Sequence, residues 1–105
     1  MFFNNGCLVS CKDKVVIGDN TQIGPNVMIF DHDHDFRQVK GLAAKKFKHS
    51  QIVIGNNVWI GANCVILRGT VIGDNCVVAA GTILSGIYDE NKLIFQKKET
   101  EANDI

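Results

Sequence analysis

The residues best suited to chemistry stand together in the run Asp31-His-Asp-His-Asp. A histidine titrates near neutral pH and can remove the proton of a substrate hydroxyl group. Two histidines separated by one residue also share a face of an extended strand, where both can bind zinc. His32 and His34 are therefore candidates for base catalysis or for metal binding, and the three aspartates can instead satisfy backbone donors of a loop.

Hexapeptide repeats must position this run. An aliphatic residue recurs at every sixth position, often followed by glycine, and the repeat runs from Ile54 through Ile60, Ile66 and Ile72 to Val78. The same spacing precedes the histidines at Ile17, Ile23 and Ile29, and continues more weakly at Cys11 and Asn5. Such self-similarity at a fixed period is typical of repeat architectures.

Each hexapeptide reads as one short strand followed by one corner. The fourth residue after each aliphatic position is mostly small or β-branched, which suits a strand facing a narrow interior. The glycine after the aliphatic residue suits a corner that needs little side chain or unusual dihedral angles. Three strands and three corners make one turn, so we predict an all-β protein, a parallel β-helix whose turns stack as parallel strands.

The prediction divides the chain into two parts. The β-helix covers residues 1–88 and is interrupted by an excursion loop over 31–53, while residues 89–105 form a capping strand and a polar tail. The residue before each aliphatic position should point outward, yet it is mostly apolar, as at Met28 and Trp59. We therefore expect other copies of the chain to cover at least one outer face.

Composition excludes several classes of partner. The 105 residues carry 11 basic and 11 acidic side chains, which argues against a nucleic-acid-binding surface. No apolar run is long enough to cross a bilayer, so we expect no membrane span and a cytoplasmic protein. The four cysteines lack paired spacing and are expected to act as small core residues, with Cys11, Cys64 and Cys76 on repeat positions.

Two longer motifs resemble a known family. They are Ile23-Gly-Pro-Asn-Val-Met-Ile-Phe-Asp-His-Asp-His and, after a basic excursion, Ile54-Gly-Asn-Asn-Val-Trp-Ile-Gly-Ala-Asn-Cys-Val. Over residues 4–86 the chain resembles the hexapeptide-repeat O-acetyltransferases, in particular the maltose, galactoside and capsular-polysaccharide acetyltransferases. The resemblance implies a left-handed β-helix, a homotrimer with sites between subunits, acetyl-CoA as the acyl donor, and a hydroxyl of a sugar or polysaccharide precursor as acceptor.

The resemblance also implies roles for individual residues. His34 matches the catalytic histidine and is expected to act as the general base. His32 is placed on the acceptor side, where it can orient His34 or bond within the loop, and His49 is expected to be solvated. The other matches place Trp59, Ala62, Ala80 and Ser85 at acetyl-CoA, and Asn4 and Asp13 at the acceptor. No metal is expected.

Two alternatives stay open. Trimeric left-handed β-helices include the γ-class carbonic anhydrases, in which histidines bind zinc, and His32, His34 and His49 can be arranged as such ligands. A truncated, non-catalytic trimeric β-helix is the second alternative, because little precedes Asn4 and the stretch from Ser85 onward differs from the family's usual ending.

Overall fold

The computed structural model describes residues 2–32, 51–97 and 100–104. These residues form thirteen short strands and no helix. The strands are β1 (Phe2–Phe3), β2 (Leu8–Ser10), β3 (Val15–Ile17), β4 (Gln22–Ile23), β5 (Met28–Phe30), β6 (Ile52–Ile54), β7 (Trp59–Ile60), β8 (Val65–Ile66), β9 (Val71–Ile72), β10 (Val77–Val78), β11 (Ile83–Leu84), β12 (Ile87–Tyr88) and β13 (Leu93–Ile94). In this part of the chain no helix could span a membrane.

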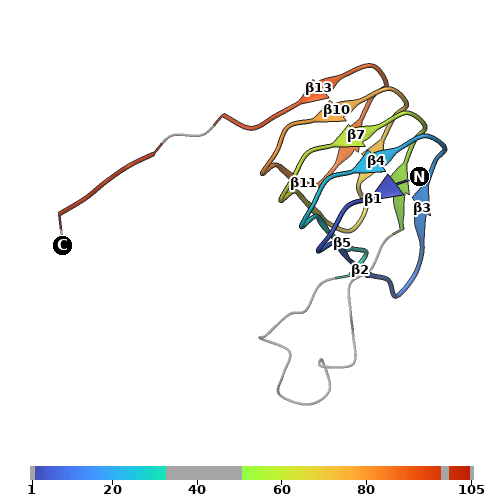
Figure 1. Ribbon diagram of the computed structural model, residues 1–105, viewed down its shortest axis with the longest axis horizontal. Helices are drawn as coiled ribbons and strands as arrows, with labels where there is room; N and C mark the ends of the chain where they lie inside the picture. Colours follow the sequence, from blue (N-terminus) through green and yellow to red (C-terminus); the bar gives the residue numbers. More distant parts are fainter. Residues whose placement is uncertain (1, 33–50, 98–99, 105) are drawn as a thin grey trace, which may run out of the picture.

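Every third strand stacks in parallel, which produces three sheets. The first sheet has the order β1-β4-β7-β10-β13, the second β11-β8-β5-β2 and the third β12-β9-β6-β3. Figure 1 shows the strands of the first sheet one above another along successive coils. The protein is a left-handed parallel β-helix, and the predicted fold class is confirmed.

The interior is a column of aliphatic side chains. Ile29, Ile60 and Ile66 have no exposed surface, and each packs between equivalent residues of the neighbouring coils. Cys64 and Cys76 are also fully buried, as predicted. Stacking is dense enough that burial of these apolar side chains holds together strands of only two or three residues.

The repeat register before Ile17 was predicted wrongly. Val9 pairs with Ile29 and Phe3 with Ile23, so the inward positions of the first coil are Phe3 and Val9 rather than Asn5 and Cys11. The next inward residue, Ile17, follows Val9 at a spacing of eight positions instead of six. The corner at residues 11–14 is therefore two residues longer than a regular one, and Cys11 is exposed instead of lying in the core.

The opposite change occurs near the other end of the repeats. Tyr88 pairs with Ile72, only four residues after the inward-facing Leu84. The regular spacing of six then returns, since Ile94 pairs with Val78 in the first sheet. A shortened corner at Ser85–Gly86 thus shifts the phase of the repeat, and β13 continues the stack beyond it.

The unusual corner dihedrals fall mainly on the third residue after the inward one, most often an asparagine, rather than on the glycine directly after the inward residue. Asn63 has φ of 59°, and five other asparagines have φ between 56° and 61°. Asparagine tolerates this left-handed conformation better than most residues. Gly61 has a different function, because a Cβ on it would lie 2.7 Å from the backbone nitrogen of Ala80 in the next coil.

The outward positions of the strands are apolar in all but one strand, and most of them are exposed. Trp59 is 60% exposed, Ile83 52% and Ile87 77%, so the prediction that this column points outward is confirmed. Most of the predicted excursion, residues 33–50, lies outside the described residues, and so do His34 and His49.

Candidate active site

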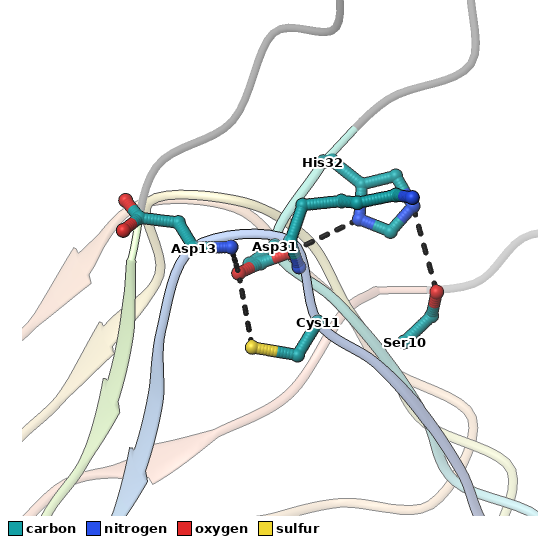
Figure 2. Close-up of polar contacts among 6 residues, drawn as sticks. Ser10, Cys11, Asp13, Asp31 and His32 are labelled. Carbon is teal, nitrogen blue, oxygen red and sulfur yellow. Dashed lines mark hydrogen bonds and ion pairs between the residues drawn. The ribbon is translucent and has the colours of Figure 1, made fainter.

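The lengthened corner at residues 11–14 is closed around the carboxylate of Asp31. The Lys12 amide donates to Asp31 Oδ1 and the Asp13 amide to Asp31 Oδ2, each at 2.6 Å. The Cys11 thiol donates to Oδ2 at 3.4 Å. Figure 2 shows this carboxylate facing the corner from the end of β5. Asp31 therefore satisfies backbone donors, as the sequence suggested, and those donors belong to the first coil.

Asp31 is fully buried but remains ionised. Burial alone acts to raise the pKa of its carboxyl group, but hydrogen bonds from His32, Lys12, Asp13 and Cys11 outweigh it and hold the pKa well below the ordinary value. The pKa of the Cys11 thiol is shifted the other way. Desolvation raises it, and so does the hydrogen bond to the Asp31 carboxylate. Cys11 is thus poorly suited to form a thiolate nucleophile.

His32 is buried beside this acid. Its Nδ1 lies 3.0 Å from Asp31 Oδ1, its Nε2 lies 3.5 Å from Ser10 Oγ, and its side chain is 1% exposed. Figure 2 shows the ring held between these two side chains. A ring so enclosed is well placed to fix the start of the excursion, which favours the predicted orienting role over direct contact with an acceptor.

A second candidate region lies on the outer face of the first sheet. There a depression of about 450 Å³ is lined by side chains of β4, β7 and β10 and by the corners beside them. It brings together three residues predicted to bind ligands, namely Asn4, Trp59 and Ala62. The polar side chains of Asn4 and Gln22 lie at the end of the depression nearer β1.

At two of the four corners between the third and first sheets, a backbone amide is satisfied by a side chain of the next coil. The Asp19 amide donates to Asn56 Oδ1 and the Asn56 amide to Asp74 Oδ1, each at 2.7 Å. This ladder needs a side-chain oxygen at the same corner position in each successive coil. It satisfies the amides of Asp19 and Asn56 along that edge of the β-helix.

The corners between the first and second sheets have no such ladder. The equivalent position is held by Pro25, Ala62 and Ala80, which offer no side-chain acceptor. Within the described residues the amides of Ala62 and Ala80 donate no hydrogen bond. Gly61 keeps the Ala80 amide uncovered, because any Cβ at residue 61 would press against it. The Ala62 amide is thus available to a ligand beside Trp59, and the Ala80 amide lies one coil further along, which fits the predicted contacts with an acyl donor.

The predicted residues fall into two groups within one chain. Asn4, Trp59, Ala62 and Ala80 lie at or before the corners that lead into the second sheet. Asp13 and His32 lie at the corners that follow it, and so does Ser85, whose amide donates to the Tyr88 hydroxyl at 3.3 Å. The two groups are therefore at opposite ends of the strands of the second sheet.

Comparisons with known proteins agree with this architecture. The family description "Bacterial transferase hexapeptide (six repeats)" matches residues 51–86. Residues 51–86 thus carry repeats of the kind that this transferase family description defines. It is 34% identical, over 94 residues, to WbbJ of Escherichia coli K12, a protein named for O-acetyl transfer in lipopolysaccharide biosynthesis; the match covers 82% of this chain and 48% of WbbJ.

Solved structures of hexapeptide-repeat transferases are similar as well. The acetyltransferase VCA0836 of Vibrio cholerae, solved with acetyl coenzyme A, superposes with a TM-score of 0.78 at 27% identity over 90% of this chain and 54% of its own. A galactoside acetyltransferase in complex with coenzyme A gives a TM-score of 0.69 at 34% identity, over 86% and 52% of the two chains. The chain thus spans about half the length of these relatives.

Sequence reasoning missed two features of these regions. The clamp of Asp31 on residues 11–14 could not be found, because the wrong register hid the longer corner. Gln22 was passed over although its position in the outward column was known from the repeat. As for the metal alternative, the described residues hold no group of three possible ligands, while His34 and His49 lie outside them.

Proposed function

We propose that this hexapeptide-repeat protein is an acetyl-CoA-dependent O-acetyltransferase that acts on a hydroxyl of a sugar or polysaccharide precursor. The observation that carries the proposal is the depression on the first sheet, where an exposed Trp59 lies with the unused amide of Ala62, and the unused amide of Ala80 follows at the same corner of the next coil. An apolar wall with a few free donors suits the pantetheine arm of acetyl-CoA, which is apolar apart from its amides. The acyltransferase relatives support the same reaction.

His34 is proposed as the general base. A sugar hydroxyl is a weak nucleophile at neutral pH, so the imidazole accepts its proton while the oxygen attacks the thioester carbonyl. The carbon–sulfur bond then breaks and coenzyme A leaves as the thiol. Backbone amides of the neighbouring wall stabilise the negative charge that develops on the carbonyl oxygen. Direct transfer needs no acylated cysteine, which agrees with the raised pKa of Cys11.

The active form is proposed to be a homotrimer. The two predicted groups lie at opposite ends of the second sheet, so a complete site is best formed where one copy's Trp59 edge meets another copy's His32 edge. Apolar outward residues on all three faces support such contacts, since they would otherwise face water. Trp59 and Ser85 stay proposed cofactor contacts, and Asn4, Asp13 and His32 stay proposed acceptor-side residues.

Acetyl-CoA is made in the cytoplasm, where we propose that the protein acts.

The test is thiol release from acetyl-CoA with a panel of sugar acceptors, for wild type and for His34→Ala. We expect the variant to lose a factor of about 10² to 10⁴ in rate, the usual contribution of a general base. His49→Ala is the matched control and should keep full activity. Equal activity of wild type and His34→Ala would remove His34 from the mechanism.

The donor and the metal alternative can be checked separately. Acetyl-CoA should raise the melting temperature of the wild-type protein, because a ligand of the native state stabilises it. No shift, together with no thiol release, would favour the non-catalytic alternative. Stoichiometric zinc in protein purified without a histidine tag would favour the carbonic-anhydrase alternative instead.

A further inference from the structure

Gln22 departs from the pattern of the outer faces. In each described strand one residue precedes the inward one and points outward. Twelve of these thirteen residues are apolar: Phe2, Leu8, Val16, Met28, Val53, Trp59, Val65, Val71, Val77, Ile83, Ile87 and Leu93. The thirteenth is Gln22 in β4. An apolar side chain would fit the column equally well, so the carboxamide needs another explanation.

The position of Gln22 links it to the depression on the first sheet. In the parallel register it stands between Phe2 of β1 and Trp59 of β7. It lines the depression together with Asn4, so one carboxamide stands next to the exposed indole ring and a second lies further toward β1. The Gln22 side chain forms no hydrogen bond to any other described residue, and its donor and acceptor are both available.

The order of strands also places Gln22 relative to the two substrates. The proposed donor contacts Trp59, Ala62 and Ala80 belong to β7, β10 and the corners after them. Asn4, the proposed acceptor contact, follows β1 at the other end of the depression. β4 lies between β1 and β7, so Gln22 stands between the acceptor side and the donor side.

We infer that Gln22 is a specificity-determining residue that hydrogen-bonds ring hydroxyls of a saccharide acceptor bound between Asn4 and Trp59. This inference rests on the proposed function. A pyranose ring has an apolar face that packs on an aromatic side chain, and hydroxyls at its edge that need both donors and acceptors. The Gln22 carboxamide supplies one of each, and the NH₂ group of Asn4 supplies a further donor, while Asn4 Oδ1 accepts from the Asn5 amide at 2.8 Å. An apolar acyl chain would leave the Gln22 carboxamide unpaired.

The test replaces Gln22 by leucine, which matches the rest of the column and should not lower the melting temperature. We expect KM for an alkyl galactoside or for maltose to rise about tenfold, the equivalent of one lost hydrogen bond. KM for acetyl-CoA should stay unchanged. An unchanged KM for the sugar, or a rise in KM for acetyl-CoA instead, would overturn the inference while leaving the acetyltransferase proposal intact.

Gln96→Leu is the matched control. The Gln96 carboxamide bonds both backbone groups of Ile83, donating to the carbonyl at 2.9 Å and accepting from the amide at 3.1 Å. It thereby covers the edge strand β11, far along the stack from β4. Its loss should lower the melting temperature without changing KM for the sugar. The two glutamines are thus expected to give opposite results in the two assays.

A binding measurement decides the inference even if no turnover is found. The side-chain amide signals of Gln22, assigned by comparison with the leucine variant, are followed by NMR during titration with an alkyl galactoside and with maltose. We expect these signals to shift while those of Gln96 stay fixed. Signals of Gln22 that do not move, whether because neither sugar binds or because one binds elsewhere, would overturn the inference.

Discussion

Replacement of Asp31 by alanine should destabilise the protein more than replacement of any other single carboxylate of the described coils. Asp31 is buried, and its two oxygens accept hydrogen bonds from the amides of Lys12 and Asp13, from the His32 ring and from the Cys11 thiol. The substitution removes all four acceptor contacts. It also frees the corner at residues 11–14, which has two residues more than a regular corner.

The expected loss follows from these contacts. A hydrogen bond to a charged group contributes roughly 1.5–3 kcal/mol, but Lys12 and Asp13 are exposed, so their amides can bond to water once the carboxylate is gone. We therefore expect about 3 kcal/mol in total, which for a domain of this size lowers the melting temperature by roughly 10–20 °C. Asp31→Asn keeps the size but should still cost about 2 kcal/mol, because its NH₂ group faces an amide donor.

The pH dependence gives the second part of this prediction. The pKa of Asp31 is lowered on folding, so its contribution is present above the pKa of the unfolded state, about 3.9, and is lost as pH falls below that value toward the folded pKa. The difference in stability between wild type and Asp31→Asn should therefore be constant from pH 7 to about pH 5 and shrink below about pH 4.

Urea unfolding at one protein concentration, repeated at several pH values, measures both effects. Asp74→Ala is the control, since the half-buried Asp74 carboxylate accepts a single amide bond, from Asn56 at 2.7 Å, and should cost no more than about 1 kcal/mol. A loss below about 0.5 kcal/mol for Asp31→Ala would refute the reasoning, as would a difference that does not change between pH 7 and pH 3.

Two further predictions concern the corners. Gly61→Ala should lower the free energy of unfolding by about 2 kcal/mol or more, because the added Cβ would lie 2.7 Å from Ala80 N and cannot be accommodated without moving the next coil. Thermal unfolding measures this loss, and a variant as stable as wild type would contradict the close approach. Asn63→Val should lower the free energy of unfolding by about 1–2 kcal/mol, because valine tolerates the left-handed φ of 59° poorly. Asn63→Gly should lower it little. Equal losses in the two variants would mean that the backbone conformation is not the cause.

The stack of coils could be predicted because the residues that recur every six positions are the ones that are buried. Ile54, Ile60 and Ile66 recur at six residues, and each enters the interior with no more than 1% exposure. The two places where the spacing changes could not be predicted. At residues 11–14 and at Ser85–Gly86 the corner gains or loses two residues, and a hexapeptide pattern carries no signal for a corner of another length. There the strand pairing, and not the sequence spacing, decides which side chain faces inward.

The candidate site likewise has a part that the repeat predicts and a part that only the structure shows. Trp59 and Ala62 belong to regular coils, so the repeat places them correctly on the outer face and at a corner, and the depression contains both. The free amides of Ala62 and Ala80 follow from a comparison that is visible only in three dimensions: Asn56 and Asp74 cap the equivalent amides at the neighbouring edge. No feature of the alanines themselves indicates that a partner is lacking.

The longer corner and the histidine run are parts of one arrangement, although the sequence separates them by about a full coil. The extra residues at 11–14 give the chain room to turn around a carboxylate, and Asp31 supplies that carboxylate from the first position after β5. Because the same carboxylate holds the His32 ring, the path of the chain into the excursion is fixed by contacts with the first coil. A substitution at Asp31 should therefore loosen the start of the excursion as well as the corner. On the proposed mechanism, activity should then fall in Asp31→Asn even where the β-helix remains folded.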